Sequence, residues 1–422
     1  MAGETKPRIL VKQDMGLHYF FAPCPRGLAA ALAEELTSLG AQHCVAADAG
    51  VSFDGPFDLI YVTNLYSRIA SRVLWRVTHV AYKNEEDVYQ AASAVRWHVY
   101  FTADRTFKVE TNAHRSPVKS LDFVTLRVKD AIADHFRSAT GRRPSVESRD
   151  PDLRIHAFLD DKMCALYIDT SGESLFKRGR RDHVGEAPLK KNLAAGILRI
   201  AGWRPGTALL DPMCGAGTFL TEAAEMSLGR AAGRERSFAF EKLARYNELN
   251  WERLLSNAKK SEKSIEALPI YGSDLYGRSL GHAVLNLREA GLESAVTLKQ
   301  VNLLELSAPS GHGSIVTNPP YGVRLGEKEK LAEFYPQLGD ALKKKFAGWT
   351  AYIFSGDPEL ARLIRLHATR KTVLYNGALE CRLYEYHIVH GGNRPEDKRP
   401  KLDAKRGAVD KVARAGSRGK RS

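Results

Sequence analysis

Short strand-like runs alternate with helical patterns across residues 17–171. A leucine repeat over residues 28–39 gives one apolar face to a predicted helix. Residues 107–111 alternate between apolar and polar side chains like a strand, and residues 123–136 have the period of an amphipathic helix. Two further strand-like runs flank residues 160–162 and predict a hairpin. This half of the chain is therefore expected to have an α+β fold.

The pattern changes after a cation-rich segment at residues 176–181 into helices that alternate with short, wholly apolar strands. Such strands are buried on both faces, so the pattern indicates a mostly parallel sheet covered by helices. Near the end, Asn376 and Gly377 separate two closely spaced strands, which predicts an antiparallel pair that closes the sheet. The strands predicted before that pair are at residues 208–211, 269–272, 296–298, 315–317 and 351–354.

Composition is that of a soluble globular protein, because 44% of the 422 residues are hydrophobic and 27% are charged. This length exceeds one ordinary core, so two or three domains are expected. The sequence has no apolar run of about eighteen residues and no apolar signal core near its start, which predicts neither a membrane span nor export. Its five cysteines are scattered, with no CxxC motif and no paired Cys and His of the kind that binds metal, so we expect no disulfides, no metal site and a cytoplasmic location.

Charge gives the first indication of a partner. Lysine and arginine number 63 against 49 acidic residues, for a net charge of +14, and a basic excess attracts nucleic acid by counterion release. Residues 393–422 hold eleven of these cations against four acids and few apolar residues, so this tail is expected to be disordered. It either adds affinity for RNA or serves only to keep the protein soluble.

A glycine turn follows the first apolar strand of the second half. Asp211 ends that strand, and Gly215 and Gly217 remove side chains so that a ligand can approach the backbone. In an open α/β sheet, ligands bind beyond the carboxyl ends of the strands, at such a turn. Leu220 replaces the third glycine of dinucleotide-binding turns, which favours S-adenosylmethionine over NAD. The alternative is a tight connection that binds nothing.

Polar residues follow the next two strands as well. Asp274 could accept hydrogen bonds from both ribose hydroxyls of a cofactor, although an aspartate here could instead cap the following helix. Asn302 could pair with an adenine edge through its amide, or it could be an ordinary turn residue.

The strongest motif is Asn318, Pro319, Pro320 and Tyr321, directly after the strand at residues 315–317. The two prolines stiffen the backbone and remove two N–H donors, so carbonyl oxygens dominate the local polarity. The side-chain oxygen of Asn318 and the carbonyl of Pro319 can accept hydrogen bonds from one planar amino group, orienting its lone pair for methyl transfer. A flipped base could stack on Tyr321. The alternative is a strand-ending turn with a surface tyrosine.

Several basic side chains are candidates for contact with RNA phosphates. Each alone could be an ordinary solvated charge, and only the cluster within residues 176–181 is favoured as an RNA contact. The candidates are Arg96, Lys108, His114, Arg115, Lys119, Arg127, Lys177, Arg178, Arg180 and Arg181.

Together, these motifs make the chain resemble the THUMP-domain-containing class I RNA methyltransferases, and especially the 23S rRNA (guanine-N2)-methyltransferase group. The resemblance covers about residues 17–390. It rests on residues 166–175, 177–179, 186–190, 211–219, 318–322 and 376–382.

The resemblance implies an α/β fold: a Rossmann-like class I methyltransferase domain with a mostly parallel seven-stranded sheet, preceded by α+β ferredoxin-like and THUMP modules. Larger bacterial members of the family carry a second methyltransferase domain beyond this one, so a single modification is expected here. The expected divisions are a ferredoxin-like module at 1–65, a THUMP RNA-binding domain at 66–171, a linker contributing to the cofactor pocket at 172–192, the methyltransferase domain at 193–392, and the basic tail at 393–422.

The resemblance also implies site roles, with S-adenosyl-L-methionine as the cofactor. Asn318, Pro319 and Tyr321 would handle the target base, while residues 187–190 would wall the cofactor pocket. Asn302 stands where many class I enzymes have an acid, so its implied contact departs from the family pattern. The implied cofactor contacts are Pro188, Leu189, Lys190, Asp211, Met213, Cys214, Gly215, Gly217, Thr218, Asp274, Leu275, Asn302 and Asn318.

The expected function is methyl transfer to the exocyclic N2 of a guanine in 23S rRNA, during rRNA processing, by a monomeric enzyme. Transfer would be direct, because no cysteine is placed as a nucleophile. Transfer RNA is the alternative substrate. A DNA adenine-N6 methyltransferase would use the same four residues, but the chain shows no DNA-reading domain. A non-catalytic RNA-binding assembly factor is a remote alternative that Asp274, Asn318 and the intact glycine turn disfavour.

Overall fold

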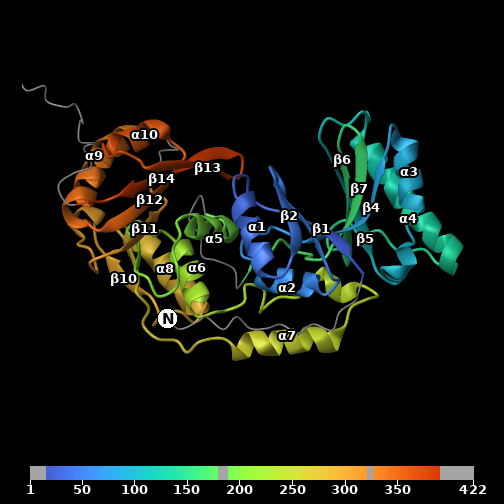
Figure 1. Cartoon of the computed structure of the whole chain (residues 1–422), viewed down its shortest axis with the longest axis horizontal. Coiled ribbons are helices and arrows are strands. Elements are labelled where there is room, and N and C mark those ends of the chain that lie inside the picture. The colour runs from blue at the N-terminus through green and yellow to red at the C-terminus, as the bar shows by residue number, and fades with distance from the viewer. Residues whose placement is uncertain (1–15, 179–188, 321–326, 390–422) are drawn as a thin grey trace, which may run out of the picture.

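The computed structural model describes residues 16–178, 189–320 and 327–389, and its two seven-stranded sheets follow one another along the long axis (Figure 1). Within these residues, no helix is both long enough and apolar enough to cross a bilayer. The predicted basic tail at residues 393–422 lies outside the described part of the chain.

The first sheet has the strand order β2-β3-β1-β4-β7-β6-β5. Strand β4 pairs with β1 on one side and with β7 on the other, so one sheet runs through both predicted N-terminal modules. The predicted hairpin is confirmed, since β6 and β7 pair antiparallel. The strands are β1 (His18–Pro23), β2 (Gln42–Ala47), β3 (Gly50–Gly55), β4 (Leu74–Ala81), β5 (Phe107–Ala113), β6 (Leu153–Leu159) and β7 (Met163–Asp169).

The helices of this half cover the sheet and supply much of its core. The predicted amphipathic helix is confirmed and is longer than its apolar pattern, because the side chain of Ser120 accepts a hydrogen bond from the Phe123 N–H and Gly141 ends the helix in the left-handed region. The helices are α1 (Ala29–Ser38), α2 (Leu59–Tyr66), α3 (Glu85–Ser93), the 3-10 turn η1 (Trp97–Val99) and α4 (Leu121–Thr140).

The second sheet has the order β10-β9-β8-β11-β12-β14-β13. Its first five strands run parallel, and β14 pairs antiparallel with both β12 and β13, as the closing pair was predicted to do. The Rossmann-like class I fold is confirmed. The strands are β8 (Leu209–Asp211), β9 (Ile270–Asp274), β10 (Thr297–Gln300), β11 (Gly313–Thr317), β12 (Trp349–Ser355), β13 (Arg370–Asn376) and β14 (Leu379–His387).

The chain order reverses between β8 and β11, which lie side by side although a long stretch of sequence separates them. A crevice for a ligand forms at such a switch point, beyond the carboxyl ends of the strands. The helices around this sheet are α5 (Lys191–Ile200), α6 (Thr218–Ser227), α8 (Gly277–Glu289), η3 (Leu303–Glu305), α9 (Glu327–Lys345) and α10 (Pro358–Leu363). Between α6 and α8 the chain also forms η2 (Ala239–Lys242) and α7 (Glu248–Lys260), which pack beside α2 of the first half (Figure 1).

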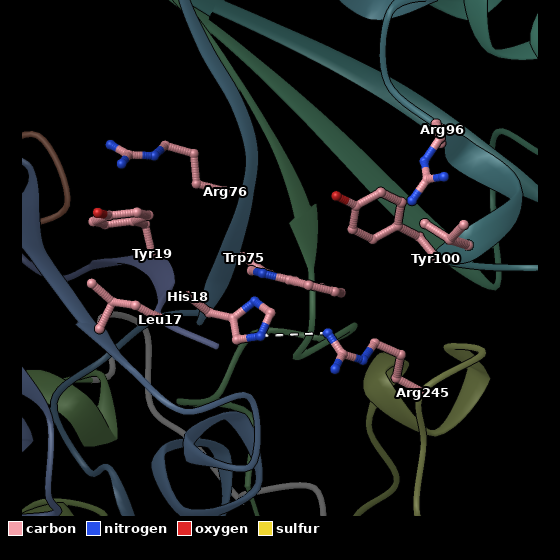
Figure 2. Close-up of a pocket in the computed structure, with 9 residues that line it drawn as sticks. Leu17, His18, Tyr19, Trp75, Arg76, Arg96, Tyr100 and Arg245 are labelled. Atoms are coloured by element: carbon pink, nitrogen blue, oxygen red, sulfur yellow. Dashed lines mark hydrogen bonds between the residues drawn. The ribbon is translucent and has the colours of Figure 1, made fainter. Parts of the chain in front are cut away.

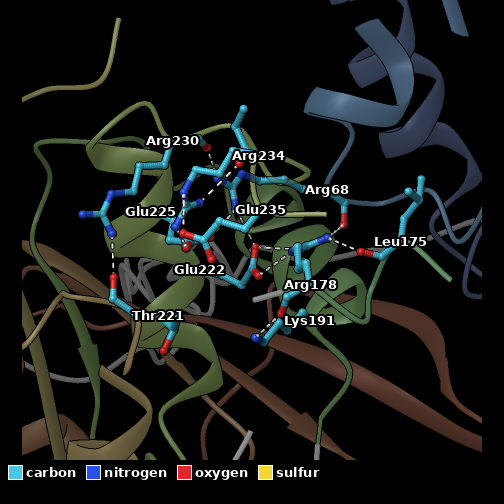
Figure 3. A network of polar contacts seen from close by, with 12 residues as sticks. Arg68, Leu175, Arg178, Lys191, Thr221, Glu222, Glu225, Arg230, Arg234 and Glu235 are labelled. Atoms are coloured by element: carbon cyan, nitrogen blue, oxygen red, sulfur yellow. Dashed lines mark hydrogen bonds and ion pairs between the residues drawn. The ribbon is translucent and has the colours of Figure 1, made fainter. Parts of the chain in front are cut away.

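A buried ion network fastens the first half of the chain to the second (Figure 3). Glu222 of α6 is fully buried and accepts hydrogen bonds from Arg68, which follows α2, at 3.0 Å and from Arg178 at 2.8 Å. Glu225, one turn further along α6, pairs with Arg68 at 3.4 Å and with Arg234 at 2.9 Å. Since α6 begins at the glycine turn, this network holds that turn in place relative to the N-terminal half.

The network corrects the interpretation of Arg178 as a contact for RNA phosphate. Its side chain is 3% exposed, and Nε and Nη2 both donate to the carboxylate of Glu222. A guanidinium that is buried and paired in this way is not presented to an RNA backbone. The sequence shows that this segment is rich in cations, but it does not show which of their side chains points inward.

Candidate functional site

The glycine turn connects β8 to α6 at the switch point of the second sheet. Gly215 and Gly217 have φ angles of +53° and +78°, a backbone region that glycine adopts without strain. A Cβ atom built on Gly215 would meet nothing within 4 Å, so this part of the backbone faces open space. A Cβ on Gly217 would lie 3.1 Å from the Cβ of Ala283, and this glycine therefore lets α6 pack closely on α8. Thr218 is the first residue of α6.

Asp274, at the end of β9, ties the neighbouring strand to this turn. Its Oδ2 accepts a hydrogen bond from the Gly215 N–H at 3.0 Å, and its Oδ1 accepts one from the Tyr276 N–H at 2.9 Å. Helix α8 begins at Gly277 with Tyr276 as its N-cap, so Asp274 does not cap that helix. The alternative of a capping aspartate is thus wrong, and binding of ribose hydroxyls by Asp274 stays a prediction.

Asp211 is a buried acid at the floor of the turn, only 2% exposed. The Thr317 hydroxyl donates to its Oδ1 at 2.8 Å, and the Met213 N–H donates to the same oxygen at 3.3 Å. Burial, with a smaller contribution from the negative charge of Asp274, raises the pKa of Asp211 to about 7. The described residues supply neither acid with an ion-pair partner.

This arrangement fits S-adenosylmethionine. A cationic ligand would provide the positive charge that the two buried acids lack, and open space at Gly215 leaves room for it beside the backbone. Within the described residues, no cluster of three or more His, Cys, Asp or Glu side chains could hold a metal ion.

The segment predicted to hold the target base begins directly after β11. Asn318 has a buried side-chain oxygen, Oδ1, that accepts no hydrogen bond from the described residues. The Tyr335 hydroxyl donates to the carbonyl of Pro320 at 3.2 Å and holds the next turn of backbone against α9. Pro319 is buried, while Tyr321 lies outside the described residues. An acceptor without a donor inside a protein is costly, so the Asn318 oxygen is suited to receive a ligand N–H.

Thr317 is a site residue that sequence reasoning missed. It is 1% exposed, ends β11, and connects the segment that begins at Asn318 to the end of β8 through its hydrogen bond to Asp211. The available signal was a polar residue at the last position of an otherwise apolar strand. That signal is weak without the knowledge that β8 and β11 are neighbours in the sheet.

Asn302, another predicted cofactor residue, has a structural role of its own. The side-chain oxygen of Asn302 accepts a hydrogen bond from the Leu304 N–H at 3.0 Å and caps η3, as expected for the alternative of a turn residue. Leu275, beside Asp274, is 51% exposed. Burial raises the pKa of the Cys214 thiol well above its ordinary value, which keeps it protonated and supports the expectation that it is no nucleophile.

Residues 189 and 190 are the described part of the linker that leads into α5. Leu189 is buried, and the ammonium of Lys190 lies 5.0 Å from the ring centroid of Phe176. Pro188, predicted to join them in walling the cofactor pocket, lies outside the described residues. No contact of this segment with the glycine turn has been established, so its role in the pocket stays a prediction.

Four of the other RNA candidates, all within the described residues, are at least partly exposed. Lys108 pairs with Glu110 at 3.1 Å, and Lys177 pairs with Glu173 at 3.0 Å. Such exposed pairs are weak, so both lysines could exchange their partner for a phosphate. Arg115 and Lys119 are exposed between β5 and α4. Arg180 and Arg181 lie outside the described residues.

Comparison with known proteins gives three family matches in chain order. Residues 19–74 match the RlmL ferredoxin-like domain, residues 82–169 match the THUMP domain, and residues 178–385 match the RMKL-like methyltransferase domain.

Relatives and solved structures extend over most of the chain. A putative RNA methyltransferase of Synechocystis is 37% identical over 370 residues, 87% of this chain and 96% of the relative. The ribosomal RNA large subunit methyltransferase K/L of Syntrophotalea carbinolica is 40% identical over 381 residues, 88% of this chain but 53% of the relative. This chain thus spans about half the length of the K/L relatives.

Among solved structures, SMU.472, a putative methyltransferase complexed with SAH, superimposes with a TM-score of 0.81 at 30% identity, covering 90% of this chain and 99% of that one. The three matched modules, the switch-point site and the full-length relatives agree. The chain belongs to the THUMP-domain-containing family of class I, S-adenosylmethionine-dependent RNA methyltransferases, with ferredoxin-like and methyltransferase domains of the RlmL type.

Proposed function

We propose that this protein methylates the exocyclic N2 of a guanine in 23S ribosomal RNA. The observation that carries the proposal is the buried acceptor Oδ1 of Asn318, at the carboxyl end of β11 and joined to the cofactor turn through Thr317 and Asp211. The names of the K/L relatives support a ribosomal RNA substrate. Such a substrate would also mean that the protein acts in the cytoplasm, where we expect a monomer.

Asn318 would act by orienting the amino group. Its Oδ1 and the carbonyl of Pro319 would accept the two N–H groups of the guanine amine, which turns the nitrogen lone pair toward the cofactor. S-adenosylmethionine supplies an electrophilic methyl group when bound. Positive charge that develops on the nitrogen is stabilised by the two fixed oxygen acceptors, which need no reorganisation during the reaction.

Asp211 and Asp274 would hold the cofactor. The Asp211 carboxylate would balance the positive charge of the ligand. Each carboxylate oxygen of Asp274 accepts one backbone N–H, from Gly215 or from Tyr276, and retains a second lone pair that can accept a hydrogen bond from a ribose hydroxyl. Tyr321 would provide the ring on which the extruded base stacks.

The direct test is nucleoside mass spectrometry of ribosomal and transfer RNA from a strain lacking this protein. We expect loss of one N2-methylguanosine from 23S rRNA and its return when the wild-type chain, but not Asn318→Ala, is supplied. Loss from transfer RNA instead would establish the alternative RNA substrate. Loss of N6-methyladenosine from RNA or DNA would overturn the guanine assignment.

An assembly factor without catalysis is separated from an enzyme by labelled methyl transfer. The purified chain should transfer label from S-adenosylmethionine to 23S rRNA isolated from the deletion strain, which lacks the modification. Transfer should be absent with rRNA from the parent strain, because its target position is already methylated. Absence of transfer to both would refute the proposed activity.

A further inference from the structure

A cavity of about 450 Å³ lies where three distant parts of the chain meet (Figure 2). Strands β1 and β4 form one side, the segment around η1 forms another, and Arg245, between η2 and α7, comes from the methyltransferase half. The lining residues are Leu17, His18, Tyr19, Trp75, Arg76, Arg96, Val99, Tyr100 and Arg245, and none of these nine is acidic.

Aromatic rings make up much of the wall. Trp75 is 3% exposed and is held edge-on by Tyr100, with ring centroids 4.9 Å apart. Tyr19 is 45% exposed, and the guanidinium of Arg76 lies 4.4 Å from the centroid of its ring. The cavity therefore combines a buried, fixed ring in its wall with the exposed ring of Tyr19, which has few rotatable bonds to immobilise when a flat ligand stacks on it.

Three guanidinium groups surround these rings. Within the described residues, Arg76 and Arg96 take part in no ion pair, and Arg245 points toward His18, with Nη1 3.4 Å from Nε2 (Figure 2). Arg76 and Arg96 differ in this from the arginines of the buried network, whose charge Glu222 and Glu225 compensate (Figure 3). A concave site with several cations and no lining carboxylate attracts an anion.

We propose that this cavity holds an unpaired nucleotide of the RNA substrate, with its base stacked at Tyr19, and that a phosphate of the adjoining single strand lies at Arg96 (Figure 2). Its volume lies within the range of sites for small ligands, about 300 to 1,000 Å³. Aromatic rings stack on any base, while a base within a duplex is already stacked and cannot enter. The inference rests on RNA being the substrate.

The nucleotide bound here is not the one that is methylated. Asn318 follows β11 in the second sheet, whereas the cavity is built on β1 and β4 of the first sheet, farther along the molecule (Figure 1). The cavity would thus grip a single-stranded stretch at a distance and set the register of the target. Arg245 would carry this contact to the methyltransferase half.

The test is fluorescence anisotropy with a labelled, unstructured RNA decamer and with a blunt RNA duplex of equal length. Tyr19→Ala should weaken decamer binding at least about fivefold, the lower end for loss of one stacked base. Arg96→Glu should weaken it about tenfold and reduce the dependence of log Kd on log salt concentration by about one unit. Neither should weaken duplex binding as much. Both side chains are exposed, so the variants should fold.

Two matched control variants change an aromatic ring and an arginine that lie in the THUMP module but outside the cavity. Phe123→Ala deletes a half-exposed aromatic ring of α4, and Arg143→Glu reverses an exposed charge outside the cavity. Both should bind the decamer within about twofold of wild type, well under the effect of one stacked base. Equal losses in the controls and in the cavity variants would refute the proposal, because binding would then depend on general surface charge.

Two further outcomes separate this inference from the proposed function. If wild type methylates RNA and Tyr19→Ala and Arg96→Glu bind the decamer as wild type does, the cavity assignment is wrong while the function stands. If wild type methylates no RNA but these variants lose decamer binding, the function fails and the cavity assignment stands. Competition by inorganic phosphate as strong as by a nucleoside monophosphate would show an anion site without a base pocket and would also overturn the assignment.

Discussion

The buried network at Glu222 predicts that the single substitution Glu222→Gln lowers the free energy of unfolding strongly. Glu222→Gln keeps the size of the side chain but removes the charge that holds two buried arginines. Arg68 retains the charge of Glu225 at 3.4 Å, whereas Arg178 would keep only neutral acceptors, among them the carbonyl oxygens of Arg68 at 3.1 Å and Leu175 at 3.5 Å. The loss therefore falls mainly on Arg178, a charged group left inside the protein.

The magnitude follows from what Glu222 contacts. Removing one partner of a buried ion pair costs about 3 to 5 kcal/mol, and the amide oxygen of glutamine, in the place of Oε2, preserves two of the three hydrogen bonds. We therefore expect a loss near the lower limit, about 3 kcal/mol. With a urea m-value of about 3 kcal/mol per M, the unfolding midpoint should fall by about 1 M.

Urea unfolding followed by tryptophan fluorescence measures this loss, with Glu235→Gln as the matched control. Glu235 belongs to the same cluster and pairs with Arg234 at 3.4 Å, but its side chain is 58% exposed. Such a pair contributes about 0 to 1 kcal/mol, so the control midpoint should move little. Equal midpoints for the two variants would refute the view that this network fastens the halves of the chain together.

Three further predictions concern the site. Asn318→Ala should lower the turnover of RNA methylation by about 100-fold or more while S-adenosylmethionine binding, measured by calorimetry, stays near wild type; wild-type rates would remove the role given to Asn318. Because the pKa of Asp211 is raised to about 7, its carboxylate is protonated at pH 6 and ionised at pH 8. The calorimetric Kd for the cationic S-adenosylmethionine should therefore fall between these pH values, and Asp211→Asn should bind weakly with no such dependence; a wild-type Kd that is constant with pH would contradict this assignment. Reversing the charges of Lys177, Arg180 and Arg181 together should raise the KM for RNA and leave the Kd for the cofactor unchanged, whereas an unaltered KM would exclude this segment from RNA binding.

The sequence predicts the strands and the motifs because each depends on residues that are close together along the chain. Short apolar runs and the glycine turn predicted the second sheet and its ligand edge, since burial on both faces removes the polar alternation of an exposed strand. The sequence also placed an acid, Asp274, at the end of the correct strand. Its hydrogen bond to Gly215 could not be foreseen, because that contact joins two strands across the sheet.

The direction of individual side chains was decided only in three dimensions. Lys177 and Arg178 are adjacent cations in one linker, yet the first is exposed and the second is buried against Glu222. Nothing local distinguishes them. The difference arises because α6 brings a carboxylate, distant in sequence, to one side of the linker.

The sequence by itself therefore determined the fold class, and it predicted a cofactor turn at Asp211 and a reacting segment at Asn318. Only the tertiary structure joined these two segments through Thr317 and assembled the cavity around Trp75 from both halves of the chain. The physical reason is the range of the interactions. Apolar periodicity and turn chemistry act within a few residues, whereas hydrogen bonds between strands and the lining of cavities depend on packing between segments that the sequence does not place together.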